Sequence, residues 1–188
     1  IPWIEKKLNV TLADSQRRAV KKAVTSKVMV ITGGPGVGKT TLVNAILRIL
    51  TVKAANVALA APTGRAAKRL SETTGMEAKT IHRLLEVDPK MGGFKRGADY
   101  PLDCDLLVID ETSMVDVPLM ASVMKALPDK AGLILGGLAI PSDGFCKVFG
   151  SAVAGVEHRA EFVLRLGVPL FSREAEQLNI LGFCLVRA

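Results

Sequence analysis

The chain has 188 residues, enough for one domain with a buried core, and 49% of them are hydrophobic while 4% are aromatic, which predicts an aliphatic core. No apolar run reaches the ~18 residues that a membrane span needs, so we expect no membrane partner. The three cysteines stand far apart without a C-x-x-C pair; this argues against a zinc site or disulfide framework and favours reduced thiols in a cytoplasmic protein. A net charge of +7 suits a polyanionic partner without identifying one.

The chain opens with Ile1-Pro2-Trp3, without an initiator methionine or an apolar signal segment, so we expect a piece of a longer polypeptide. Residues 1–10 are interpreted as an introductory segment or linker. A first helix is expected to begin in residues 11–16, because Leu12, Ala19 and Ala23 recur there and beyond at helical spacing.

Four short, continuously apolar segments predict strands at residues 28–32, 57–61, 106–110 and 133–136. Helical patterns lie near residues 40–50, 63–73, 79–85 and 117–127. Apolar strands separated by helices predict an α/β fold whose mostly parallel sheet is covered on both faces. Residues 88–101, rich in glycine and charge, predict a surface loop. After Leu138 the periodicity is mixed, and no element is predicted there.

A complete phosphate-binding loop follows the first predicted strand and opens the next helix. It has the pattern G-x-x-x-x-G-K-[ST] and reads Gly33-Gly34-Pro35-Gly36-Val37-Gly38-Lys39-Thr40. Backbone N–H groups in such a turn, with the positive end of the helix dipole, hold a triphosphate. We predict that Lys39 reaches the β and γ phosphates, that the Thr40 hydroxyl binds Mg²⁺, and that Thr41 completes the site. A glycine-rich turn that binds nothing is disfavoured, because strand, loop, lysine, hydroxyl and helix all agree.

Two adjacent acids, Asp110 and Glu111, end the apolar segment that begins at Leu106. Phosphoryl-transfer sites of this kind need a carboxylate at the carboxyl end of a strand, beside the phosphate loop, to hold the metal. Asp110 is predicted to take that role. Glu111 is expected to point elsewhere, because side chains alternate along a strand, and to orient or deprotonate the attacking water. The pair favours hydrolysis; a kinase would need an acceptor pocket, which the sequence does not supply.

Five segments in this order resemble the RecD/TraA group of superfamily-one DNA helicases. They are Thr11-Leu12-x-x-x-Gln16, the phosphate loop, Ala61-Pro62-Thr63-Gly64-Arg65-Ala66-Ala67-Lys68-Arg69-Leu70, Thr80-Ile81-His82-Arg83-Leu84-Leu85, and Val108-Ile109-Asp110-Glu111-Thr112-Ser113-Met114-Val115-Asp116. The resemblance covers roughly residues 8–137. It implies a P-loop NTPase fold, a RecA-like three-layer α/β/α domain, with residues 11–137 as the first RecA-like motor domain of a RecD-like protein.

The resemblance also implies residue roles. Gln16 would read the adenine edge, since an amide donates and accepts at once; otherwise it is a solvated helix residue. Single-stranded DNA would be contacted by two short motifs, of which the first suits a phosphate clamp because a hydroxyl and a cation stand at a helix start. Their residues are Pro62, Thr63, Gly64 and Arg65, then Thr80 and His82. For His82 a structural hydrogen-bonding role is an equal alternative.

After Gly137 the chain departs from the family pattern. The family continues with an acidic residue, a Gln and Leu-Pro-Ser, and that Gln senses the γ-phosphate and links hydrolysis to DNA; here the segment 138–144 has neither the acid nor the Gln. A damaged or frameshifted tail and a genuinely divergent protein both explain this. Phe171-Ser172-Arg173 resembles the stretch that leads to an arginine contacting the γ-phosphate, which makes Arg173 the implied catalytic arginine. Residues 138–188 are interpreted as a divergent continuation of the motor domain.

In function, the resemblance implies an ATP-dependent DNA helicase that translocates 5′ to 3′ in its complete form, with ATP and Mg²⁺ as cofactors and single-stranded DNA as partner. Superfamily-one motors step by closing two RecA-like domains on ATP. The second RecA-like domain of the longer protein, and other recombination or repair subunits, are therefore implied partners, and this chain alone should not unwind DNA. The alternative is a nucleotide-dependent binding or switch module that hydrolyses weakly because it lacks the sensor motif.

Overall fold

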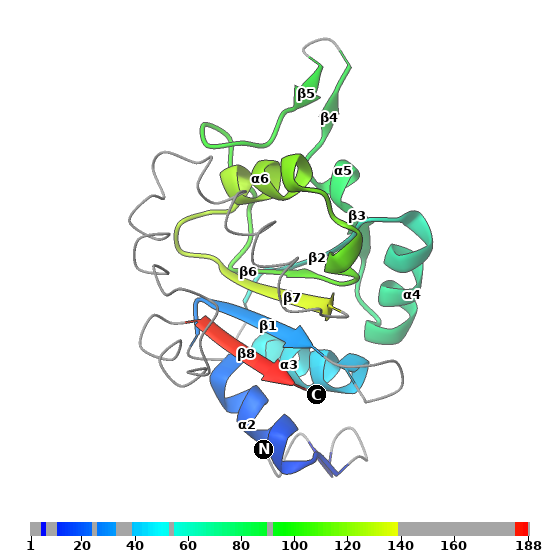
Figure 1. Cartoon of the computed structure of the whole chain (residues 1–188), viewed down its shortest axis with the longest axis vertical. Coiled ribbons are helices and arrows are strands. Elements are labelled where there is room, and N and C mark those ends of the chain that lie inside the picture. Colours follow the sequence, from blue (N-terminus) through cyan, green and yellow to red (C-terminus); the bar gives the residue numbers. More distant parts are fainter. Residues whose placement is uncertain are drawn as a thin grey trace.

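The computed structural model describes residues 5–6, 11–23, 26–32, 39–52, 55–89, 92–138 and 183–187, and the structural statements below concern these residues. Their centre is a six-stranded sheet in the order β3-β2-β6-β7-β1-β8 (Figure 1). Every neighbouring pair in it is parallel. The strands are β1 (Val28–Thr32), β2 (Val57–Ala61), β3 (Ala78–Thr80), β6 (Leu106–Ile109), β7 (Gly132–Leu138) and β8 (Phe183–Arg187).

Helices cover both faces of this sheet. The evidence is that successive side chains of β1 belong alternately to two different hydrophobic cores. Val28 and Val30 belong to one apolar cluster, while Met29 and Ile31 belong to the other. The first cluster contains buried residues of α6 (Val117–Ala126) and α5 (Ile81–Leu84); the second contains those of α2 (Asp14–Ala23) and α3 (Lys39–Val52), with Leu70 of α4 (Gly64–Thr74). The predicted three-layer α/β/α fold with a parallel sheet is confirmed.

Capping residues fix where two of the helices begin and one ends. The Thr63 side chain accepts a hydrogen bond from the Ala66 N–H at the start of α4, and Asp116 accepts one from Leu119 at the start of α6. Helix α4 ends at Gly75, whose φ of 70° is left-handed and whose N–H donates to the Ser71 carbonyl. These caps satisfy backbone groups that a helix end leaves unpaired.

The strand predictions agree with the structure most closely at β1 and β2, whose bounds are those expected. Strand β6 ends one residue earlier than expected, at Ile109, and β7 is longer than the predicted 133–136. The predicted helix at 79–85 is wrong in its first part, because Ala78–Thr80 form the edge strand β3. Pairing with β2, Leu59 opposite Ala78, overrides the local helical pattern, and the helix α5 begins only at Ile81.

Besides β3, three strands have no counterpart in the sequence predictions. The expected surface loop at 88–101 contains part of an antiparallel hairpin of β4 (Val87–Asp88) and β5 (Gly93–Phe94), which projects from the body of the domain (Figure 1). Strand β8 pairs in parallel with β1, in a region where no element was predicted. Within the described residues, helices are too short or too polar to cross a membrane.

Candidate functional site

The carboxyl edge of the parallel sheet gathers the chain segments that the sequence singles out, because parallel strands all end at the same edge. Strand β1 ends at Thr32 and α3 begins at Lys39, so the phosphate-loop sequence connects these two elements. The loop residues 33–38, the side chains of Lys39 and Thr40, and Arg173 lie outside the described residues. Thr41 is half-buried within the first turn of α3.

Strand β7 lies between the strand that leads into the phosphate loop and the strand that leads into the acidic pair. Val30 of β1 and Ile109 of β6 are both register partners of Leu135 in β7, so these two residues are level with each other. Strand β6 ends there, whereas β1 continues for two more residues to Thr32, the partner of Leu138. Neighbouring strands are about 4.8 Å apart, which puts about 10 Å between β1 and β6. Asp110 thus follows the strand next but one to β1, and its place beside the phosphate loop stays a prediction.

The acidic pair forms a tight turn immediately after β6. The Asp110 N–H donates to the Ala60 carbonyl at 3.0 Å, which continues the sheet pairing by one residue. Asp110 Oδ1 accepts the Glu111 N–H at 2.9 Å, and the Glu111 carbonyl accepts the Met114 N–H at 3.0 Å. Both carboxylates belong to half-buried residues. The turn leads into the short 3₁₀ helix η1 (Thr112–Met114).

Glu111 adopts a left-handed backbone conformation, with φ 53° and ψ 39°. Left-handed geometry is uncommon for residues other than glycine and is concentrated at functional sites. The expected reason for the two acids pointing apart, alternation along a strand, is therefore wrong, because β6 ends at Ile109 and Glu111 lies beyond it in a turn. The turn itself separates the orientations of the two residues.

Two glycines at the end of β7 pack against this turn. A Cβ atom at Gly136 would lie 3.1 Å from Asp110 Oδ1, and one at Gly137 would lie 2.6 Å from both N and Cα of Glu111. The Ser113 hydroxyl donates to the Gly137 carbonyl at 3.3 Å. The acidic turn therefore packs against two residues of β7 that have no side chain. The sequence analysis did not predict this contact. The feature that could have indicated it is the pair of glycines, Gly136 and Gly137, near the end of a strand.

The residues expected to contact DNA come from the two loops after β2 and β3. These loops lie side by side, because Ala61 at the end of β2 pairs with Thr80 at the end of β3. Thr63 and Thr80 both act as helix caps, each hydroxyl accepting a backbone N–H at 3.2 Å. Pro62 is half-buried, whereas Gly64 and Arg65 are exposed. Arg65 forms no ion pair within the described residues.

His82 contacts the hairpin. Its ring lies 5.8 Å from the Phe94 ring, centroid to centroid, at an interplanar angle of 54°. The base of the same hairpin is tied down by the Arg96 guanidinium, which binds the Glu86 carboxylate at 2.7 Å, donates to the Pro101 carbonyl and lies over the Tyr100 ring. Hydrogen bonding to Glu86 raises the pKa of Arg96.

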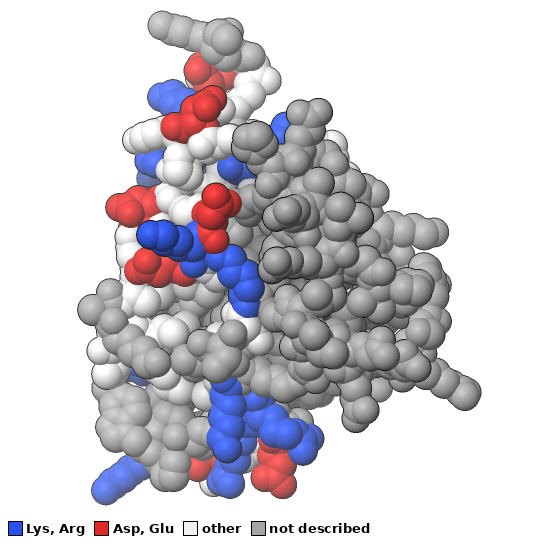
Figure 2. All heavy atoms as spheres, turned by 90° about the vertical axis from the view of Figure 1, so that its left-hand side faces the viewer, with Lys and Arg blue, Asp and Glu red and all other residues white. Residues whose placement is uncertain are grey.

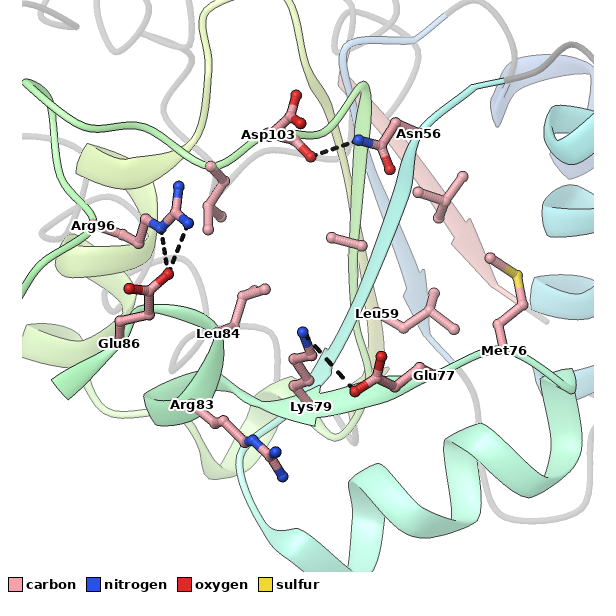
Figure 3. A pocket seen from close by; sticks show the side chains of 13 residues that line it. Asn56, Leu59, Met76, Glu77, Lys79, Arg83, Leu84, Glu86, Arg96 and Asp103 are labelled. Atoms are coloured by element: carbon pink, nitrogen blue, oxygen red, sulfur yellow. Dashed lines mark hydrogen bonds and ion pairs between the residues drawn. The ribbon is translucent and has the colours of Figure 1, made fainter.

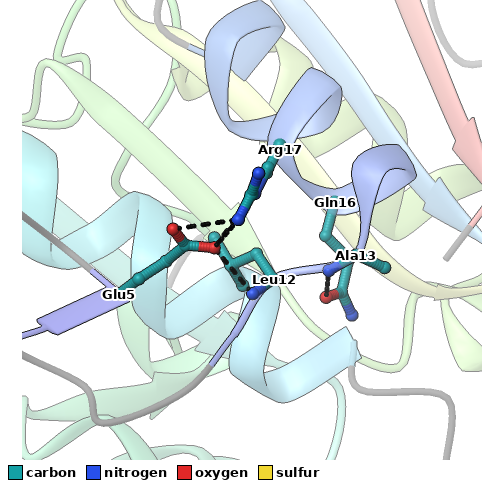
Figure 4. A network of polar contacts seen from close by, with 5 residues as sticks. All are labelled: Glu5, Leu12, Ala13, Gln16 and Arg17. Atoms are coloured by element: carbon teal, nitrogen blue, oxygen red, sulfur yellow. Dashed lines mark hydrogen bonds and ion pairs between the residues drawn. The ribbon is translucent and has the colours of Figure 1, made fainter. Parts of the chain in front are cut away.

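Gln16 lies on α2, where its Oε1 accepts the Ala13 N–H at 3.0 Å (Figure 4). In this conformation the amide oxygen caps its own helix with one of its lone pairs, so its second lone pair and the N–H₂ group are left to contact a base. The neighbouring Arg17 pairs with Glu5 at 2.9 Å. Hydrogen bonds from the Leu12 N–H and from Arg17 lower the pKa of Glu5, which anchors the chain before the helix.

Basic side chains gather at the lower end of the face seen in Figure 2, the end at which Figure 1 places α2. Helix α2 carries Arg17, Arg18 and Lys21 among its described residues. Higher on the same face, basic and acidic side chains are mixed. A polyanion approaching this end would therefore meet a more uniform positive charge than at the upper end.

A cavity of about 460 Å³ extends from the amino ends of β2 and β6 to β3 and α5 (Figure 3). Its lining includes Asn56 and Asp103, which precede β2 and β6, and its charged groups are mixed in sign, with Glu86 paired to Arg96 and Glu77 3.9 Å from Lys79. Asn56 and Asp103 stand before the amino ends of their strands, whereas Lys79 and Arg83 adjoin Thr80 and His82, so the lining reaches the end of β3.

The arrangement matches a known family along most of its length. A family model described as AAA domain matches residues 16–138. The chain belongs to this family. The match runs from Gln16 through the phosphate loop and the acidic turn to the end of β7, so it contains the residues of the carboxyl-edge site apart from Arg173.

Relatives of this AAA domain include DNA helicases of the RecD type. It is 39% identical over 134 residues to the ATP-dependent RecD2 DNA helicase of Deinococcus radiodurans, covering 71% of this chain and 18% of the relative. It is 38% identical over 148 residues to the RecBCD enzyme subunit RecD of Mycolicibacterium smegmatis, covering 66% and 27% respectively. The predicted resemblance to RecD-like helicases is confirmed, and the chain spans less than a third of the length of these relatives.

A solved structure agrees on the fold. The helicase domain of Hef from Pyrococcus furiosus superposes with a TM-score of 0.50 at 14% identity, covering 82% of this chain and 38% of that one. At this identity the likeness concerns the architecture alone, a RecA-like arrangement of parallel strands between helices.

Proposed function

We propose that this AAA domain is the ATP-binding and ATP-hydrolysing motor domain of a RecD-like DNA helicase. The observation that carries the proposal is the carboxyl edge of the sheet, where β1 leads into the phosphate loop and β6 leads into Asp110 and Glu111, with β7 between the two strands. Near this edge β7 carries Gly136 and Gly137, and their lack of a side chain lets the strand approach Asp110 and Glu111 closely.

In this proposal the triphosphate is held by the turn between β1 and α3, through residues 33–38 and Lys39, with Thr41 at the start of the helix. Mg²⁺ is held by the Thr40 hydroxyl and the Asp110 carboxylate together with phosphate oxygens. Few protein ligands are needed, since Mg²⁺ in such sites keeps several waters and binds through one or two carboxylates. This fits the described residues, among which no group of three or more His, Cys, Asp or Glu side chains could hold a metal. The bound metal supplies charge neutralisation at the phosphates.

Glu111 is proposed to orient and deprotonate the attacking water. Its backbone is fixed by Asp110 Oδ1 and the Met114 N–H, so its carboxylate is directed by a rigid turn rather than by a flexible loop. Arg173 remains the proposed arginine on the γ-phosphate, and Gln16 the proposed adenine contact through its amide group. These two assignments rest on the family resemblance.

The DNA-binding part of the proposal places single-stranded DNA across the adjoining loops after β2 and β3. The N-terminus of α4, with Arg65 exposed beside it, suits a backbone phosphate. Pro62, Thr63 and Gly64 shape this loop, while Thr80 and His82 shape the next one. Because the Thr63 and Thr80 hydroxyls already cap helices, we assign the direct phosphate contacts to backbone N–H groups and to Arg65.

The complete motor is proposed to contain a second RecA-like domain that closes on ATP, to move 5′ to 3′ and to act with recombination or repair subunits in the cytoplasm. One relative is named as a subunit of the RecBCD enzyme, which supports the proposal that this protein also acts with other subunits. In this proposal the domain moves along DNA only together with the second RecA-like domain, and we expect it not to unwind a duplex by itself.

A second candidate is a nucleotide-dependent switch module that binds ATP and hydrolyses it weakly. It is favoured by one observation, the absence after Gly137 of the acid and Gln with which the family senses the γ-phosphate. Phosphate release from Mg²⁺-ATP, measured with and without a single-stranded oligonucleotide, separates the candidates. Turnover stimulated by DNA supports the motor domain; ATP binding with turnover that DNA leaves unchanged supports the switch. A phosphorylated acceptor in place of free phosphate would contradict both.

A further inference from the structure

The end of β7 touches the acidic turn through backbone atoms alone at its closest point. Gly137 has a φ of 77°, and a Cβ atom added to it would lie 2.6 Å from both N and Cα of Glu111. Real Cβ atoms do not come that close to other atoms, so an L-residue with a side chain at 137 must displace the Glu111 backbone or β7. The adjoining Ser113 hydroxyl bonds to the Gly137 carbonyl at 3.3 Å.

The conformation of Glu111 needs such support. A residue with a long side chain remains left-handed only where its surroundings over-determine it. Here the N–H is held by Asp110 Oδ1, the carbonyl by the Met114 N–H, and the Cα by the close approach of Gly137. Of these three constraints, the contact with Gly137 is the one that comes from a different strand. It therefore couples the end of β7 to the direction of the Glu111 side chain.

We propose that Gly137 is a positioning residue for the Glu111 carboxylate, and that displacement at the end of β7 reaches this carboxylate through the backbone contact. The inference rests on the proposed function, in which Glu111 orients the attacking water. Gly137 itself touches neither nucleotide nor water in this proposal. It sets the rate of hydrolysis by fixing Glu111, and it leaves nucleotide binding to the phosphate loop.

The chain offers a matched control for the test. Gly75 has nearly the same backbone angle, φ 70°, yet no atom lies within 4 Å of where its Cβ would be. Gly75→Ala therefore introduces the same backbone strain without a collision, and Gly137→Ala introduces strain together with displacement of Glu111. Both variants are compared with the wild-type 188-residue chain in kcat and KM for Mg²⁺-ATP with single-stranded oligonucleotide, in nucleotide Kd, and in thermal unfolding.

We expect Gly137→Ala to lower kcat by roughly 10- to 100-fold, as displacement of a catalytic group by about 1 Å does, with KM and Kd within about twofold of wild type. Gly75→Ala should lose thermal stability and keep its kcat. In a Glu111→Gln background, Gly137→Ala should lower turnover no further, because a positioning residue acts only through the group it positions. Equal kcat in the Gly137→Ala and Gly75→Ala variants, or full additivity with Glu111→Gln, overturns the inference.

A second variant keeps the test decisive if alanine at 137 prevents folding. Ser113→Ala removes the hydrogen bond to the Gly137 carbonyl from an exposed residue and should lower kcat by about 2- to 10-fold at unchanged KM, the range that one hydrogen bond contributes. An unchanged kcat in that case overturns the inference. A wild-type chain without any turnover overturns the proposed ATPase and this inference together, whereas a wild-type chain that hydrolyses ATP, with variants that do so equally well, overturns the inference alone.

Discussion

Ala61, the last residue of β2, is the register partner of Thr80, the last residue of β3. This pairing joins two sequence segments that each leave the sheet at its carboxyl edge, and it places the helix caps Thr63 and Thr80 on neighbouring loops. The pairing therefore places the two proposed DNA-binding motifs next to each other on the surface at the carboxyl edge of the sheet. That surface lies on the β3 side of β6, whereas the phosphate loop follows β1 on the other side.

Lys39→Ala is expected to abolish ATP turnover and to leave the fold intact, because it removes the cation proposed to reach the β and γ phosphates. Phosphate release and thermal unfolding of the purified variant measure the two effects. The control is Arg48→Ala, which removes an exposed cation from the same helix, further from the phosphate loop. Wild-type turnover in Lys39→Ala would remove the ATPase assignment.

Glu111→Gln should separate binding from hydrolysis. Asp110 still holds the metal in this variant, so ATP should bind with unchanged affinity, while turnover falls by at least ~10²-fold, as expected for loss of a general base. Asp110→Asn is the comparison, and we expect it to weaken Mg²⁺-dependent nucleotide binding. Binding is followed with a fluorescent nucleotide and turnover by phosphate release. If both variants lose binding to the same extent, the two acids have been assigned the wrong roles.

Cys104 should give the domain a pH-dependent stability in the alkaline range. The residue is 7% exposed, and burial raises the pKa of its thiol from 9.0 to about 11, with Asp105 and Asp103 adding to the shift. A raised pKa in the folded state means that the folded chain holds its proton longer than the unfolded chain. The contribution of Cys104 is therefore constant below pH 9, and stability falls as the pH rises from 9 toward 11.

Denaturant unfolding of wild type and Cys104→Ala between pH 7 and 11 tests this. The difference between their free energies of unfolding should be constant up to pH 9 and should then shrink, because only the wild type loses stability through the thiol. Curves that stay parallel up to pH 11 would show that the Cys104 thiol has an ordinary pKa in the folded chain.

The parts of the fold that could be predicted are those in which the local sequence and the sheet agree. Strands β1 and β2 are continuous apolar runs, so burial on both faces of a parallel sheet is visible in the sequence itself. The segment Ala78-Lys79-Thr80 contains no such run, and its strand conformation comes from pairing with β2 at the sheet edge. Strand β8, which pairs with β1, does begin with an apolar run from Phe183 to Val186, and this local signal was not used in the prediction. Such pairings over long sequence separations are not encoded in local periodicity.

The candidate site also has some features that local sequence predicts and others that depend on the whole fold. Asp110 and Glu111 could be found from an apolar run that ends in two acids after a phosphate loop. Their separation from that loop by β7 could not be found, because strand order in a sheet is a property of the whole fold. The left-handed turn at Glu111 and its contact with Gly137 could not be found either, since both result from how close two backbones come.

Arg65→Ala should weaken binding of single-stranded DNA by the domain for every sequence, because a phosphate contact carries no base information. Wild-type affinity should fall steeply with salt, with a slope of about −0.7 for each phosphate contact to a single strand. Removing Arg65 should make the slope shallower by up to about one such unit. Titration of both proteins with an oligonucleotide at three salt concentrations gives the slopes.

The control is Lys125→Ala, which removes an exposed cation from α6, a helix in the core cluster on the opposite face of the sheet from α2 and α3. It changes the net charge as Arg65→Ala does, so a general electrostatic effect would alter both slopes alike. A slope that changes only in Arg65→Ala, at unchanged thermal stability, identifies a phosphate contact at the loop after β2. The opposite result, a loss of stability with slopes that match the wild type, would mean that Arg65 supports the fold and that DNA binds elsewhere.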